Sequence, residues 1–317
     1  MKTKYYMIAL AAMTMMLGSC SESNSEFSQD YLADTPIKLN VSVDEPTTRA
    51  GYSDADKPTG FVLEVVNHNA DKYNYLVWAK KVGDSWKTYK PDETLKGGTD
   101  EEVTMLWANM NDKVDVTAFT NIGTITIPTD QTSDDQLKEA DVLYMPFTKY
   151  TPTNKGITVN LQHAMSKINL TIELGSEYEF SEEDVDLKIT DVKIDGSSVS
   201  GDLASGGIYD VSGAPTPISP FCTGTTPYSK TNGTITKAKA TYEAILIPQY
   251  IESGNFTISF KVDGKLYEWA YNQRLALLPT YAYTLKLIAG DDKVQPVSFS
   301  VAAWGKGNGD GEEKETD

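Results

Sequence analysis

Few side chains in this sequence have the type and spacing that catalysis requires. Its two histidines, His68 and His163, belong to no HExxH motif, and no GxSxG or CxxC pattern is present. Carboxylates cluster at 134–135 and 182–184, where paired acids could serve glycoside hydrolysis or bind calcium. Acids adjacent in loops are usually solvated, and no EF-hand spacing is found. We therefore predict a protein that is not an enzyme, with no cofactor and no metal site.

Cys20 has the most clearly defined chemistry in the chain. An apolar run from Tyr5 to Leu17 follows two lysines, and small residues precede the cysteine in the sequence Leu-Gly-Ser-Cys. This pattern is typical of a lipoprotein signal peptide over 1–20, which is removed when Cys20 is lipidated. The apolar run is too short to span a membrane, so acyl chains provide the attachment.

The residues after Cys20 predict where the protein is held. Ser21 begins a serine-rich, acidic stretch, and we expect 21–36 to be a solvated tether. An Asp at this position would favour the inner membrane, so Ser21 favours the outer membrane. The choice between its inner and outer leaflet stays open.

Composition limits the possible partners. The chain of 317 residues has a net charge of -17 and no cluster of Lys and Arg, which argues against nucleic acid. Apart from Cys20 the only cysteine is Cys222, so no disulfide framework can form within the mature chain. We expect Cys222 to be a small buried hydrophobic residue.

Apolar residues alternate with polar ones along most of the chain, which predicts strands with one buried face. The predicted strands are 37–43, 61–66, 73–79, 103–107, 114–119, 157–161, 168–174, 187–194, 242–247, 256–262, 265–271, 281–287 and 297–301. Asp263-Gly264 is a two-residue hairpin turn, and Asp134–Ala140 is a possible helix. Without crossover helices a parallel α/β sheet is excluded, so the fold class is all-β.

Length and turn residues predict two domains. The segment 147–156 is rich in turn residues, and a new series of strands begins after it. We predict an N-terminal β-sandwich over 37–160, a C-terminal β-sandwich over 161–304 and a flexible acidic tail over 305–317.

Several short motifs, taken in order, resemble the fimbrillins of type V pili. They are the lipoprotein signal, Thr47-Thr48-Arg49-Ala50 after a first strand, Leu161-Gln162-His163-Ala164-Met165-Ser166-Lys167-Ile168 leading into a strand, Leu246-Ile247-Pro248, and a last strand ending Val301-Ala302-Ala303-Trp304. The resemblance spans nearly the whole chain. It implies two transthyretin-like β-sandwiches in tandem, a structural subunit or tip adhesin of a fimbrium, and other pilin subunits as partners.

The resemblance also implies processing and assembly by donor-strand exchange. Lipoprotein-processing machinery would modify Cys20, and an arginine-specific surface protease would cut between Arg49 and Ala50. The protein would then pass from a lipid anchor in the outer membrane to the fimbrium at the cell surface. The cut would release the first strand, which carries Ile37, Leu39, Val41 and Val43, and the candidate donor strand carries Val297, Phe299 and Val301.

The distribution of arginines gives independent support to this processing site. The mature chain has only two, Arg49 and Arg274, and Arg49 lies in a segment containing Pro, Thr and Gly, where nicking is easy. The tail after Trp304 cannot itself be a donor strand. If the last strand belongs to the second sandwich, the subunit accepts a strand without donating one, as a tip adhesin or an anchor would.

A second hypothesis is a surface-anchored lipoprotein that binds glycans and does not polymerise. The chain has 18 Tyr and 5 Trp, and exposed aromatic rings are suited to sugars. A host or bacterial surface ligand is therefore a possible partner, with no site that the sequence locates.

Overall fold

The computed structural model describes residues 32–44, 51–180, 188–203, 209–290, 293–304 and 314–315. This part of the chain is mostly β, with a single α-helix, α2 (Asp134–Ala140). Two short 3-10 helices, η1 (Asp71–Tyr73) and η2 (Ser176–Tyr178), lie between strands. The predicted β class and the predicted helix are both confirmed.

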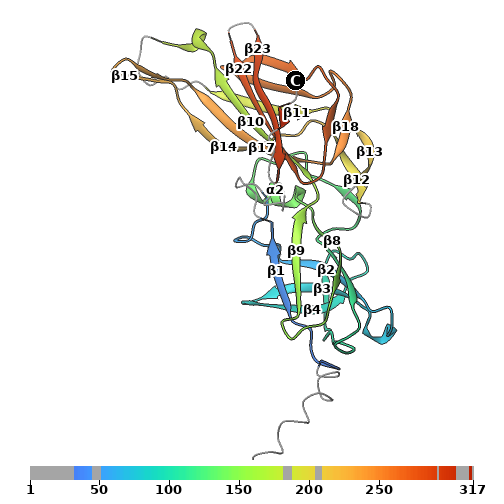
Figure 1. Cartoon of the computed structure of the whole chain (residues 1–317). Helices are drawn as coiled ribbons and strands as arrows, with labels where there is room; N and C mark the ends of the chain where they lie inside the picture. Colours follow the sequence, from blue (N-terminus) through green and yellow to red (C-terminus); the bar gives the residue numbers. More distant parts are fainter. Residues whose placement is uncertain are drawn as a thin grey trace, which may run out of the picture.

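One large sheet has eight strands. In spatial order they are β1 (Leu39–Val43), β9 (Ile157–His163), β8 (Leu143–Tyr150), β6 (Val114–Phe119), β2 (Gly60–Val66), β3 (Tyr75–Val82), β4 (Ser85–Pro91) and β5 (Gly98–Glu102). The strands β1 and β5 are therefore its two edges. Figure 1 shows β1, β2, β3, β4 and β9 together in one half of the molecule.

The remaining sheets are built mainly from the second part of the chain. A six-stranded sheet has the order β14 (Phe221–Thr226), β17 (Lys239–Leu246), β10 (Ser166–Leu174), β22 (Tyr281–Ala289), β23 (Val294–Ala303) and β24 (Lys314–Glu315). Two three-stranded sheets are β11 (Ile189–Asp195), β19 (Thr257–Val262), β20 (Lys265–Ala270), and β13 (Tyr209–Pro215), β12 (Ser198–Leu203), β7 (Gly123–Thr126). Two strand pairs are β15 (Ser229–Thr231) with β16 (Thr234–Thr236), and β18 (Gln249–Ile251) with β21 (Leu275–Leu277).

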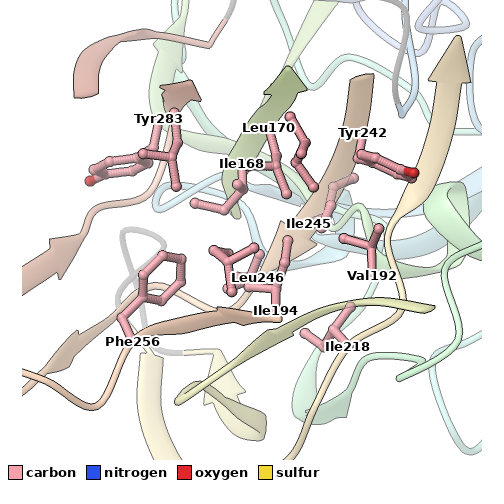
Figure 2. Close-up of a cluster of buried hydrophobic side chains, with 14 of the residues drawn as sticks. Ile168, Leu170, Val192, Ile194, Ile218, Tyr242, Ile245, Leu246, Phe256 and Tyr283 are labelled. Carbon is pink, nitrogen blue, oxygen red and sulfur yellow. The ribbon is translucent and has the colours of Figure 1, made fainter. Parts of the chain in front are cut away.

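The buried apolar residues form two clusters. One lies within 32–161, and the other contains residues from 125 to 304. In the second, Ile168 and Leu170 of β10 face Val192 and Ile194 of β11 across the space between two sheets (Figure 2). Burial of such side chains contributes about 1.5–3 kcal/mol each. Two separate clusters support our proposal of a division near residue 160.

One segment of the first part packs into the second cluster. The buried residues are Ile125 of β7, Ile127 just after β7, and Leu137 of α2. The strand β7 also pairs with β12 of the second part. Ser133 starts α2 with a capping box, in which its hydroxyl accepts from the backbone N–H of Gln136. The segment from β7 to α2 is therefore an exception to the proposed division at 160, because it precedes residue 160 but packs with the second part.

The predicted strands agree with the structure at all but one place. Val103–Trp107 is not a strand, because only Leu106 forms an isolated bridge, to Pro36, while Met105 and Trp107 are buried in the first core cluster. The hairpin at Asp263-Gly264 is confirmed, with φ angles of 46° and 86° joining β19 to β20. Within the residues described, no helix is long and apolar enough to span a membrane.

Candidate functional site

The strand predicted to be released, β1, is an edge strand that pairs with β9 alone. The pairing is parallel, and it sets Leu39 opposite Ile157, Val41 opposite Val159 and Val43 opposite Leu161. Backbone bonds at the two ends of the strand, Ile157 N–H to Lys38 O and Asp44 N–H to Leu161 O, are both 2.9 Å long. One neighbouring strand therefore pairs with β1 itself, while just before β1 the Ile37 N–H donates to Met105 O at 2.9 Å.

The side chains of β1 cover part of the first core cluster. Val43 is 3% exposed, while Ile37, Leu39 and Val41 are half-buried against the same cluster. The strand also lies very close to the turn before β9: a Cβ on Gly156 would lie 2.1 Å from Lys38 O. Only glycine leaves room there, and its φ of +82° is also in the region that favours glycine.

The predicted processing residues Arg49 and Ala50 lie outside the described residues, as does Cys20. Arg49 lies in the linker between β1 and β2, and the described residues on either side of it are Asp44 and Gly51. After the linker, Tyr52 donates its backbone N–H to Asp141 Oδ2 at 2.8 Å. A Cβ on Gly51 would lie 2.4 Å from the same oxygen, so the chain passes directly against the Asp141 carboxylate. The linker is thus anchored at both ends to the body of the protein.

Asp141 belongs to a buried polar cluster that also contains His163, Lys167, Glu243 and Trp304. His163 Nδ1 lies 2.9 Å from Asp141 Oδ1, and both side chains are fully buried. The ring nitrogen and the carboxylate are therefore within hydrogen-bond distance. The His163 ring stacks on the Trp304 indole at 4.0 Å between centroids.

The same cluster contains a buried ion pair. Lys167 Nζ lies 3.1 Å from Glu243 Oε2 and 5.7 Å from the centroid of the Trp304 ring. Burial lowers the pKa of Lys167, and Glu243 opposes that shift. Burial also raises the pKa of Asp44, against the attraction of His163. Ionised groups buried in this way are stable only while they keep their partners.

The cluster brings together residues that are distant in sequence. Asp141 follows α2, His163 ends β9, Lys167 is the second residue of β10, Glu243 lies in β17 and Trp304 follows β23. The linker after the predicted cut and the end of the predicted donor strand therefore meet at one buried point. The sequence analysis did not identify Asp141, Lys167 or Glu243. For Lys167 the available signal was a charged residue near the start of an apolar strand.

The candidate donor strand β23 is already paired within its own chain. It runs antiparallel to β22 from Val294, opposite Ala289, to Ala303, opposite Tyr281. Val297 is 52% exposed, whereas Phe299 and Val301 are half-buried against the second core cluster. The predicted released strand and the predicted donor strand thus lie in different sheets.

Two further expectations can be compared with the structure. Cys222 is exposed, so its predicted burial is wrong: it lies in β14, an edge strand with mostly exposed side chains. In the described part of the chain, no group of three His, Cys, Asp or Glu side chains is arranged to hold a metal ion.

One family model matches most of the chain. Residues 61–304 match the family model described as fimbrillin-like. No curated protein matches the sequence.

Two solved structures share this fold over most of the chain, and a third match is weaker. A candidate cell adhesion protein from Bacteroides ovatus has a TM-score of 0.56 at 15% identity, covering 84% of this chain and 97% of the other. One from Bacteroides uniformis has a TM-score of 0.54 at 16% identity, covering 85% and 98%. The tip fimbrial protein Mfa3 from Porphyromonas gingivalis has a TM-score of 0.47 at 10% identity, covering 84% and 99%.

Proposed function

Because the chain belongs to the fimbrillin-like family, we propose that it is a pilus subunit or tip adhesin that is exported as a lipoprotein and assembled by donor-strand exchange. Members of this family are fimbrial, cell-surface structural and adhesion proteins and are not enzymes. The finer steps proposed are lipidation at Cys20, cleavage after Arg49 and release of β1. The fold proposed for the two parts is a tandem of transthyretin-like β-sandwiches.

The single-neighbour pairing of β1 is the observation that carries this proposal. Three half-buried side chains and one buried side chain correspond to on the order of 5 kcal/mol of apolar burial. Loss of β1 would expose that surface together with the backbone donors and acceptors of β9. A strand of similar alternation restores both, which is the physical basis of strand addition.

The position of β23 supports an acceptor that does not donate. Every residue of the strand except Val297, which lies at a bulge, is paired with β22, and the last residue leads directly to buried Trp304. Donation would require this pairing to break and the polar cluster to lose its indole. We therefore place the subunit at the tip or at the anchor of the pilus.

Digestion with a trace of arginine-specific protease tests this function. The mature protein, produced from Ser21 onward, is followed by intact mass and by size-exclusion chromatography. We expect one cut, after Arg49, with loss of the N-terminal fragment and no growth of SDS-resistant oligomers. Arg49→Ala is the resistant control. Arg274→Ala is the matched control, because Arg274 already contacts Glu252 at 3.4 Å and the Tyr250 ring.

Each alternative outcome has a definite meaning. Growth of SDS-resistant oligomers after the cut would identify a stalk subunit that donates as well as accepts. Resistance of wild-type protein at Arg49 would refute processing at this site.

A further inference from the structure

A cavity of about 380 Å³ lies on the outer face of the eight-stranded sheet, over β3, β4 and β5. Trp78 and Lys80 of β3 line it, whereas Val77 and Ala79, which alternate with them, are buried in the core. It lies near the edge opposite β1, since β1 and β5 end the sheet. The cavity is therefore separate from the proposed strand-exchange site.

Two glycines make room for the indole of Trp78. A Cβ on Gly60 would lie 2.5 Å from Trp78 Cζ2, and one on Gly98 would lie 2.6 Å from Trp78 Cδ1. Neither glycine has a positive φ, so backbone conformation does not require glycine at these positions. Their absent side chains instead let a large ring lie between β2 and β5. Tyr89 stands opposite Trp78 on β4 and adds a second aromatic ring to the lining.

Four polar groups of the cavity have no hydrogen-bond or ion-pair partner among the described residues, whereas the Thr99 hydroxyl accepts from the backbone N–H of Glu101. The four are the Trp78 indole N–H, the Lys80 ammonium, the Asp100 carboxylate and the Thr59 hydroxyl. Neighbouring charges on the same strands do pair, with Lys87 3.2 Å from Glu102 and Lys90 3.7 Å from Glu101. Unpaired donors and acceptors therefore gather at the cavity beside two aromatic rings.

These features select one class of ligand. A sugar ring has an apolar C–H face, which suits an aromatic ring, and a hydroxyl rim that both donates and accepts. A phosphate or other anion would meet the Asp100 carboxylate on a chain of net charge -17. We propose that this cavity binds a neutral hexopyranose unit of a surface glycan, with Trp78 as the stacking ring and Lys80 and Asp100 as hydrogen-bonding groups.

The test uses defined monosaccharide probes at millimolar concentration. Methyl α-mannopyranoside, methyl β-galactopyranoside, methyl β-glucopyranoside and N-acetylglucosamine are each added to the intact mature protein labelled with nitrogen-15. Tryptophan indole N–H signals are followed by NMR, and the Trp78 signal is the one missing from Trp78→Phe. We expect at least one probe to shift the Trp78 signal and to leave the other four unshifted.

Surface variants keep the test independent of folding. Lys80→Ala and Asp100→Ala change exposed side chains and are each expected to weaken binding about tenfold. Lys87→Ala, on the neighbouring strand and outside the cavity, is the matched control and should bind as wild type does. The proposal is overturned if no probe shifts the Trp78 signal, or if both cavity variants bind as tightly as the control.

Discussion

Replacement of Glu243 by Gln tests the buried polar cluster most sharply. Lys167 is 0% exposed and Glu243 is 7% exposed, so the substitution leaves an ammonium without its partner in the interior. Loss of one member of a buried pair costs about 3–5 kcal/mol. The loss in the free energy of unfolding is limited, because Lys167 can be buried as a neutral amine instead of as an ammonium. Starting from the ordinary pKa of 10.5, that costs about 5 kcal/mol at pH 7.

The pH dependence distinguishes this electrostatic penalty from a packing defect. Burial lowers the pKa of Lys167 in the folded state, so the unfolded state binds more protons between that lowered pKa and about pH 10.5. Stability therefore rises with pH in that range, by up to about 1.4 kcal/mol per unit for a fully neutral lysine. Because Glu243 opposes the lowering, its loss lowers the pKa of Lys167 further, so Glu243→Gln should gain more stability with rising pH than wild type does and its loss should shrink between pH 7 and pH 9.

Urea unfolding at pH 7, 8 and 9, followed by tryptophan fluorescence, measures this effect. Glu102→Gln is the control, because the exposed pair of Glu102 and Lys87 is worth no more than about 1 kcal/mol. Lys167→Met combined with Glu243→Gln removes both charges and should recover most of the loss at pH 7. A change below about 1 kcal/mol, or one that is equal at pH 7 and pH 9, would refute the reasoning.

Three further predictions follow from single contacts. Asp141→Ala removes the acceptor of the Tyr52 N–H, so we expect a loss of about 1–3 kcal/mol in urea unfolding and faster cutting of the linker by the arginine-specific protease; unchanged rates would contradict it. Burial raises the pKa of Tyr283 to about 12, so its contribution to stability is present below pH 10 and lost as pH rises towards 12. Tyr283→Phe should weaken that alkaline loss in thermal melts, whereas an identical alkaline limb would argue against it. Gly156→Ala places a Cβ against Lys38 O and strains φ. We expect a lower Tm and faster hydrogen exchange of the backbone amides of β1. An unshifted Tm would disprove it.

Alternation predicted strands well where one face is buried. In β10 and β22 the apolar residues recur at every second position, and both strands lie where they were expected. β5 was missed because all of its side chains are exposed, so it has no apolar face to recognise. Val103–Trp107 was mistaken for a strand because Met105 and Trp107 are buried in alternation, although the segment forms only one isolated bridge.

Pairing between distant segments was beyond the reach of sequence periodicity. Nothing in the pattern of β1 shows that it runs parallel to β9, or that β10 runs parallel to β22. The sequence also does not show that α2 packs against the second core cluster, since a helix with one apolar face fits any core. Strand periodicity is local, whereas the choice of neighbour depends on the whole fold.

The candidate site stays a prediction, with which the position of β1 is consistent. The strand carrying Leu39 and Val43 is an edge strand, as release requires, while Cys20 and Arg49 remain predictions because they lie outside the described residues. The polar cluster was missed because burial of Lys167 depends on β10, β17 and the end of β23 meeting in space.

Exchange of β1 for a labelled copy of itself tests the central claim most directly. A fluorescent peptide of residues 36–44 is added to mature protein before and after cutting at Arg49, and uptake is measured by size-exclusion chromatography. We predict stable uptake by the cut protein with release of its own N-terminal fragment, and none by uncut protein or by Arg49→Ala after the same treatment. Complete cutting without uptake, or equal uptake by the uncut protein, would contradict the account.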